Sequence, residues 1–560
     1  MSNTLITRVY GDFRGCDFRG EDVDITRSPD SLNMWKDYKD ITCIRTRPKM
    51  KEIEKFGGIV WGIYFYNLED KEIMIVHSGS KLYKIVDGER TEIFDGANNS
   101  NSEAFIYNNI WYFKDGKNYL RYDGEIIEEI VGYIPTTSIG RAPGGGGQIH
   151  EDVNLLSSRR INTFLADGEG TEYYLDAENI DTDFAPIVKI NDKLAKNYVV
   201  NYEEGKIIFG SPPSVPLTDG QDNVSVEFSK TVEGYKDKIY NCTLLQIFDN
   251  RVFFAGNPNY PNTVFHCSLD DPSYCSDLDY YNEGLDDALV TGLVAGNNAL
   301  WVFKESSNAN TSVFYHTPTI DDEYGKIYPS VHSSVSTGCV GGAINFNDDI
   351  VFFSERGMEG ISGDITTEQV LGHRSTLIDR KLLVEKNYKD MKLAEWEGYL
   401  LIFIDNKVYL ADSRAMFTNG NHVEYDFFYW ELSENIKSTC VKDGVLYLGT
   451  KDRIYTLTDN ESDVVSYWTT PKDKFNYVHK LKTTNKRGCT VEALGDISIY
   501  AKTEKSDFEL IGTYENVTDY LVSRIKRKKF KDLQLRFYSD KRFRLETASL
   551  EVFVGAYIKR

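Results

Sequence analysis

The sequence is poor in the residue patterns on which most metal, redox and hydrolytic sites depend. Its 8 cysteines form no CxxC pair, so neither a zinc site nor a redox motif is indicated. Its 8 histidines form no HxH, HExxH or HxxxH pair, and no GxSxG segment occurs, which argues against histidine metal sites and serine esterases. We therefore expect no catalytic residue, no metal and no cofactor. The cysteines are expected to be buried free thiols of a chain made in a reducing cytoplasm.

Long apolar runs and positive charge are also scarce. No stretch approaches the roughly 18 apolar residues of a membrane-spanning helix, and the first residues, MSNTLITRVYGDFRG, lack the apolar core of a signal peptide. The 64 Lys and Arg against 86 Asp and Glu give a net charge of -22. This balance argues against a protein that grips nucleic-acid phosphates.

Aromatic residues, in contrast, are abundant. The chain of 560 residues has 37 Tyr and 30 Phe, and aromatic side chains fit the half-buried face of a β-sheet. Its length exceeds one compact core, so we expect several strand-rich domains.

A short unit recurs along the chain: a polar turn pair followed by an apolar, aromatic-rich segment. The turn pairs are Glu69-Asp70, Asn108-Asn109, Asp249-Asn250, Asn297-Asn298, Asp348-Asp349, Glu397-Gly398 and Asp443-Gly444. Asn, Asp and Gly tolerate the positive φ of two-residue hairpin turns, so each unit predicts a hairpin with a buried second strand. Most units lie roughly 40 to 50 residues apart, the length of one four-stranded propeller blade.

One interval, from Asn109 to Asn250, is much longer and predicts an inserted domain. It holds the glycine-rich segment 141–154, interpreted as a flexible linker, and short alternating strands from Ile161 to Lys230. Long alternating segments after residue 463 predict a second sandwich.

The predicted fold is therefore all-β: a propeller of about seven blades with an inserted β-sandwich domain and a C-terminal β-sandwich. We assign an N-terminal arm to 1–40, blades one and two to 41–134, the inserted domain with its linker to 135–235, the remaining blades to 236–462 and the C-terminal sandwich to 463–560. A set of sandwiches is the alternative, since any strand-rich chain shows turn and strand patterns.

One positive run stands out near the C-terminus. It comprises Arg524, Lys526, Arg527, Lys528, Lys529 and Lys531, and it is followed by Arg536, Lys541, Arg542 and Arg544. Three interpretations stay open: the solvent-facing edge of a strand, where lysines block edge pairing, contact with an acidic partner subunit, or contact with DNA.

Several segments together resemble a known family. They are FRGEDVDITRSPDSLNMWKDY (18–38), the join PTTSIGRAPGGGG…EDVNLLSSRRINTF, GNPNYPN (256–262), LADSR and the terminal VGAYIKR. In this order they resemble bacteriophage stabilisation proteins, which are similar to the tail hub or nozzle proteins of short-tailed phages. The resemblance covers nearly the whole chain, although nozzle proteins can be considerably longer.

The resemblance implies a homo-oligomer, a hexameric ring at the lower end of a virion tail. Such a ring contacts other tail or connector proteins and closes the DNA channel. It retains the packaged genome, which passes without sequence-specific binding, and opens for ejection. The resemblance further implies synthesis in the host bacterial cytoplasm, a possible host-surface contact and no catalytic residues.

The resemblance also implies that Ser28 to Asp37 form an inter-subunit or propeller-anchoring arm. Its candidate contact residues are Ser28, Pro29, Leu32, Asn33, Met34 and Trp35.

Two other functions stay open beside the structural one. Propellers host glycosidases, and a pair of carboxylates cannot be read from sequence alone, so a carbohydrate-binding or carbohydrate-cleaving adhesin acting on the host surface is the alternative. A generic interaction scaffold is the third.

Overall fold

Strands dominate the computed structural model, which describes residues 4–37, 39–68, 71–309, 311–322, 325–333, 335–362, 370–419, 422–459 and 463–557. Its helices are short: α1 (Tyr235–Tyr240), α2 (Asp379–Leu382) and a 3-10 turn at Tyr388–Asp390. No helix in these ranges is long and apolar enough to span a bilayer. The chain divides into two compact units, unit 1 (Met1–Tyr66, Lys71–Asn101 and Ser333–Arg560) and unit 2 (Asn67–Asp70 and Ser102–His332).

The predicted turns form because their residues accept a left-handed backbone. Five of the seven pairs have positive φ at both positions: Asn108-Asn109, Asp249-Asn250, Asn297-Asn298, Glu397-Gly398 and Asp443-Gly444. The sixth predicted pair, Asp348-Asp349, was wrong by one residue, since the pair with positive φ is Asn347-Asp348. Glu69-Asp70 lie outside the described residues. These turns match the twist of the strands that they join.

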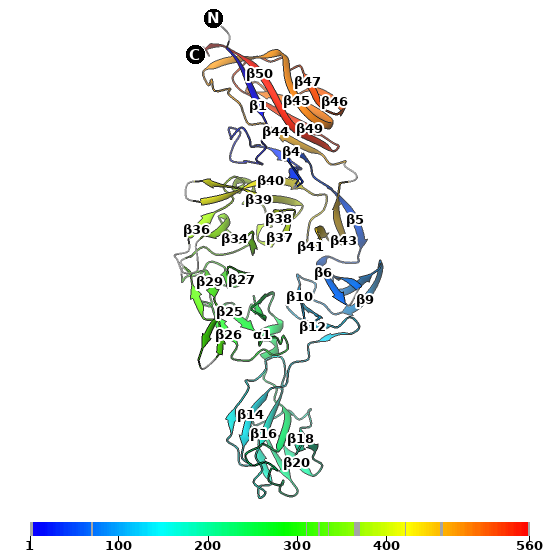
Figure 1. Cartoon of the computed structure of the whole chain (residues 1–560), viewed down its shortest axis with the longest axis vertical. Coiled ribbons are helices and arrows are strands. Elements are labelled where there is room, and N and C mark those ends of the chain that lie inside the picture. Colours follow the sequence, from blue (N-terminus) through cyan, green and yellow to red (C-terminus); the bar gives the residue numbers. More distant parts are fainter. Residues whose placement is uncertain are drawn as a thin grey trace. The chain divides into compact units, whose positions relative to one another are not determined.

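Four blade sheets lie largely in unit 1 (Figure 1). The first comprises β6 (Val60–Leu68), β7 (Lys71–Ser78), β8 (Lys81–Val86) and β9 (Glu89–Asp95). The second comprises β33 (Ala343–Phe346), β34 (Asp349–Ser354), β35 (Gly357–Ser362) and β36 (Val370–His373). The third comprises β37 (Lys392–Trp396), β38 (Tyr399–Ile404), β39 (Lys407–Asn419) and β40 (His422–Glu431). The fourth comprises β41 (Ser438–Lys442), β42 (Val445–Gly449), β43 (Arg453–Thr458) and β5 (Lys49–Lys55).

Three further blade sheets lie in unit 2. The first of these comprises β10 (Glu103–Tyr107), β11 (Ile110–Lys114), β12 (Tyr119–Tyr122) and β13 (Ile127–Glu129). The second comprises β23 (Leu244–Phe248), β24 (Arg251–Ala255), β25 (Thr263–His266) and β26 (Tyr280–Asn282). The third comprises β27 (Val290–Gly296), β28 (Ala299–Lys304), β29 (Val313–His316) and β32 (Ser330–His332). A small hairpin of β30 (Thr319–Asp321) and β31 (Gly325–Ile327) precedes β32. The second strands are buried, β28 and β38 along their full lengths. The fold is therefore the predicted seven-bladed propeller.

The fourth blade of unit 1 takes its outer strand from the other end of the propeller sequence. β5 pairs antiparallel with β43, from Lys49 opposite Thr458 to Lys55 opposite Arg453. A blade made from both ends of the repeat array closes the propeller by backbone hydrogen bonds.

The segment expected as an N-terminal arm is instead built into unit 1. β1 (Thr4–Tyr10) pairs with β50 (Phe543–Tyr557), and β2 (Ser31–Leu32) pairs with β44 (Ser466–Thr469). β3 (Met34–Asp37) and β4 (Asp40–Thr46) connect β40 to β50, so that one hydrogen-bonded sheet of 15 strands joins a blade to the C-terminal domain. Figure 1 shows β4 between β40 and β50.

The C-terminal β-sandwich follows the predicted alternating segments. Its other strands are β45 (Lys480–Thr503), β46 (Ser506–Val517), β47 (Tyr520–Ser523), β48 (Lys528–Phe530) and β49 (Leu533–Ser539). Inward side chains such as Ile499, Phe537 and Leu550 are buried in one core that also includes blade residues.

The inserted β-sandwich has a six-stranded and a three-stranded sheet around one core. The larger sheet has β14 (Thr136–Arg141), β15 (Gln148–Ile149), β16 (Arg159–Phe164), β18 (Ile187–Ile190), β19 (Lys193–Leu194) and β22 (Val224–Ser229). The smaller has β17 (Glu172–Tyr174), β20 (Tyr198–Asn201) and β21 (Lys206–Phe209). Phe164, Tyr173 and Phe228 lie in the core between them.

The glycine-rich segment is not a free linker, contrary to its interpretation from composition. It forms the β14–β15 hairpin, and Arg141 is buried, donating hydrogen bonds to the carbonyls of Tyr174 and Leu175. A Cβ at Gly147 would lie 2.6 Å from the carbonyl oxygen of Ile139. Gly147 thus allows close backbone approach within the domain.

Candidate functional site

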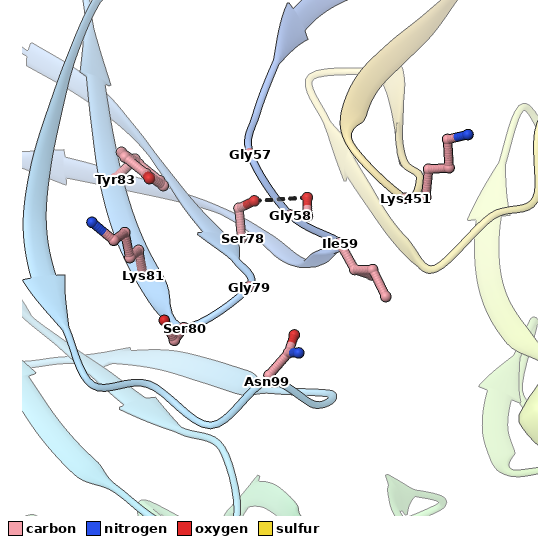
Figure 2. Close-up of a pocket in the computed structure, with 10 residues that line it drawn as sticks. All are labelled: Gly57, Gly58, Ile59, Ser78, Gly79, Ser80, Lys81, Tyr83, Asn99 and Lys451. Carbon is pink, nitrogen blue, oxygen red and sulfur yellow. Dashed lines mark hydrogen bonds between the residues drawn. The ribbon is translucent and has the colours of Figure 1, made fainter.

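A pocket of about 480 Å³ lies in unit 1 where the closing strand β5 leads into β6. Figure 2 shows three turns meeting there: the β5–β6 connection, the β7–β8 turn and the turn that bears Lys451. The lining residues are Gly57, Gly58, Ile59, Ser78, Gly79, Ser80, Lys81, Tyr83, Asn99 and Lys451.

The floor of the pocket is backbone brought close by glycine. The amide of Gly79 donates to the carbonyl of Ile59 at 2.9 Å, and Ser78 Oγ donates to the carbonyl of Gly58 at 2.8 Å (Figure 2). A Cβ at Gly58 would lie 3.0 Å from Cα of Gly79, which itself has φ +61°. Side chains at these two positions would separate the turns and change the pocket.

The rim carries hydrogen-bonding groups but no carboxylate. Asn99 Oδ1 accepts a hydrogen bond of 2.7 Å from Trp61 Nε1. Lys81 lies 2.8 Å from Glu92, whose hydrogen bond raises the pKa of the lysine. Because the lining residues include no Asp or Glu, this pocket offers no general acid and base for glycoside hydrolysis. It offers hydroxyl, amide and ammonium groups suited to binding polar ligands.

The predicted contact residues of the N-terminal segment lie mostly inside the chain. Ser28 Oγ donates to the carbonyl of Thr469 at 2.8 Å, and Asn33 Nδ2 donates to the carbonyl of Val465 at 2.8 Å. Both side chains are buried, so they hold the segment to the C-terminal domain.

Met34 and Trp35 are buried as well. The ring of Trp35 stacks on Trp396 with centroids 5.6 Å apart and meets Trp430 edge-on at 5.4 Å. Pro29 and Leu32 are half-buried. Ser28, Asn33, Met34 and Trp35 are therefore not available to a second subunit, because the chain's own core covers them. Trp35 thereby packs this segment against β37 and β40 of the propeller.

The basic run follows β47 and leads into β48. Arg524, Lys526 and Lys529 are exposed, whereas Arg527 is half-buried and pairs with Glu509 at 2.5 Å. The side chain of Lys528 lies outside the described part of the structure. Between β47 and β48, Arg524 and Lys526 are exposed on either side of the buried Ile525, so both cations face solvent.

A charged cluster in the β33–β36 blade has no signal in the sequence. His373 lies between two carboxylates, with Nδ1 3.2 Å from Glu359 and Nε2 2.6 Å from Asp379. Burial opposes the charged imidazole, but hydrogen bonds to Asp379 and Glu359 outweigh it and raise the pKa of His373 to about 10. The ring is thus a cation that links β36, β35 and α2. Its partners are 6 and 14 residues away along the chain, in no recognisable motif.

None of the eight cysteines forms a disulfide; seven are buried, as expected, whereas Cys440 is half-buried. Burial raises the pKa of Cys16 and of Cys242 to about 12. Within the described ranges, no group of three or more His, Cys, Asp or Glu is placed to hold a metal ion.

No protein-family model and no curated protein matches the chain. Among solved structures, similarity is found to BamB from Moraxella catarrhalis (TM-score 0.35, 9% identity, covering 73% of this chain and 98% of that chain). The chain is also similar to YCF48 bound to D1 peptide (TM-score 0.33, 8% identity, covering 74% of this chain and 99% of that chain). A third similar structure is Kluyveromyces lactis Hsv2 (TM-score 0.32, 9% identity, covering 74% of this chain and 94% of that chain). At these values the similarities say nothing about the function of this chain.

Proposed function

We propose that the chain is a structural subunit of a bacteriophage tail, a hub- or nozzle-like protein that assembles into a ring around the DNA channel. The observation that supports this best is the 15-stranded sheet in which β3 and β4 connect a propeller blade to the C-terminal domain. A force that separates the two must break backbone pairs such as Met34 with Tyr429 and Ile44 with Leu545. Such a connection suits a part that bears load.

The pairing pattern also suits a particle that waits outside cells. β1 pairs with β50 across more than 500 residues of sequence, from Thr4 opposite Val554 to Tyr10 opposite Ala548. Sheets made from such distant segments fold slowly. If these strand pairs are already broken in the transition state for unfolding, they raise the barrier to unfolding, and the protein also unfolds slowly.

The net charge of -22 fits a ring through which DNA must pass without stalling, since acidic surfaces do not bind phosphates. Mass spectrometry of purified particles and negative-stain microscopy of the purified chain test the proposal. We expect the chain in the particles and a ring in the micrographs. A monomer that is absent from particles would exclude a tail role.

The pocket of Figure 2 favours a second candidate, a carbohydrate-binding propeller. Tyr83, Asn99 and Lys451 surround an open hollow in which ring hydroxyls could exchange hydrogen bonds. A glycan array with wild type and the N99A/K451A variant tests it. Glycan binding that the variant loses would support an adhesin, and equal signals from both proteins would remove the pocket from consideration.

A further inference from the structure

The C-terminal domain differs in charge from the rest of the chain. Residues 463–560 contain 20 Lys and Arg against 13 Asp and Glu, a net charge of +7, whereas the whole chain carries -22. Residues 1–462 therefore carry -29. Two copies can attract each other if the C-terminal domain of one meets an acidic surface of the other.

The exposed side chains of β47 and its extension form a strip on this domain. Tyr520, Val522, Arg524 and Lys526 are exposed, while Leu521, Ser523 and Ile525 between them are buried. The strip, called the basic strip below, comprises those four exposed residues. Tyr520 and Val522 are 63% and 56% exposed, so apolar surface lies directly beside two cations.

The basic strip begins on an edge strand, and its two cations have no ion-pair partner among the described residues. Among the described strands, β47 hydrogen-bonds to β45 alone. Among the residues that the structure describes, no carboxylate lies within ion-pair distance of Arg524 or Lys526, although the neighbouring Arg527 pairs with Glu509. Both cations are therefore available to a partner.

A matching acidic edge occurs on the β10–β13 blade. It comprises Asp123, Glu125, Ile126 and Glu129 at and before the outer strand β13, which pairs only with β12 among the described strands. These residues are exposed, Ile126 by 62%. Backbone hydrogen bonds from Ile126 and Glu125 lower the pKa of Asp123, and only Glu128 in this segment is paired, with Arg121. Here, too, charge and apolar surface lie together on an unpaired sheet edge.

We infer that the basic strip of one copy docks on the acidic edge of a neighbouring copy. The two surfaces are different, so the contact is heterologous, and contacts of this kind form rings when their rotation closes. Apolar contact between Tyr520 or Val522 and Ile126 supplies buried area, and the charges set the register. The inference rests on the proposed ring function and names the surfaces that build the ring.

Analytical ultracentrifugation of the full chain at low and high salt tests the contact. We expect R524E/K526E to weaken self-association by at least about tenfold, because each reversal places like charges opposite each other. The reversal E125K/E129K should weaken it similarly. The combined variant, in which both signs are exchanged, should recover most of the association.

The control variant is K189E/K196E, which makes the same change in net charge on exposed lysines of the inserted domain. It should associate as wild type does. Circular dichroism checks that each variant folds, and the neutral R524Q/K526Q variant, which should weaken association to an intermediate extent, replaces the reversal if that does not fold.

Self-association unchanged in R524E/K526E, or lost equally in the control, would overturn the inference. Retention of duplex DNA that R524E/K526E abolishes, with self-association unchanged, would overturn it also and assign the strip to a polyanion. Neither result bears on the proposed function, which fails separately if purified particles lack the chain.

Discussion

The side-chain oxygen of Asn33 accepts hydrogen bonds from Nε of Arg47 at 2.9 Å and from the backbone amide of Glu431 at 2.8 Å. Asn33 thereby connects the N-terminal strands to the β37–β40 blade at a position where its backbone is left-handed, with φ 56°. The Arg47 guanidinium also donates to the carbonyl of Glu431 at 2.7 Å, and burial lowers its pKa to about 10.

Replacing Asn33 should separate the backbone contribution from the side-chain contribution. N33G keeps the left-handed backbone but loses the hydrogen bonds, and N33A adds about 1–2 kcal/mol of backbone strain to that loss. We expect the free energy of unfolding, measured with urea, to decrease from wild type to N33G and further to N33A. Equal stability of all three proteins would show that this connection contributes little.

Trp35 is the largest side chain in the link between the propeller and the C-terminal domain. W35A should lower the stability of unit 1 by about 3–5 kcal/mol, because it leaves a cavity against Trp396 and Trp430. L217A, at a leucine that is 94% exposed, is the matched control and should unfold as wild type does. Equal midpoints for W35A and L217A would show that the tryptophan cluster does not hold the segment.

The raised pKa of His373 makes stability depend on alkaline pH. The folded-state pKa of about 10 exceeds the unfolded value of about 6.5. The charged histidine therefore stabilises the fold fully below about pH 6.5, and this contribution is lost as the pH rises towards 10. We expect the Tm of wild type to fall more between pH 6 and pH 9.5 than that of H373N. Parallel curves for the two proteins would contradict the role of the histidine cation.

The turn pairs predict opposite effects of two substitutions at one position. Asn109 has φ 60°, so N109G should keep or slightly raise stability, whereas N109V should cost about 1–2 kcal/mol because a β-branched residue is strained there. Thermal unfolding of both variants measures the difference. A valine variant as stable as the glycine variant would contradict the hairpin geometry.

Local pattern was enough to predict the hairpins and the number of blades. The positive φ at Asn108-Asn109 follows from the residues themselves and their neighbours, and so do the buried strands after such turns. The alternation of exposed and buried residues from Tyr520 to Lys526, of which Tyr520–Ser523 form β47, could also have been recognised from local pattern.

Pairing between distant segments could not be predicted in this way. Nothing near Met34 indicates that it pairs with Tyr429, so residues 1–40 were interpreted as an arm. Composition likewise suggested a linker at Gly144 to Gly147, where glycine instead permits a tight hairpin. The His373 cluster depends on the positions of three elements in space, which single-sequence patterns do not contain.

Quantitative mass spectrometry of purified phage particles tests the central claim most directly. The account predicts that the chain is present at a fixed number of copies per particle, in the ratio to the other tail proteins that a closed ring requires. Particles that eject DNA normally but do not contain the chain would contradict it.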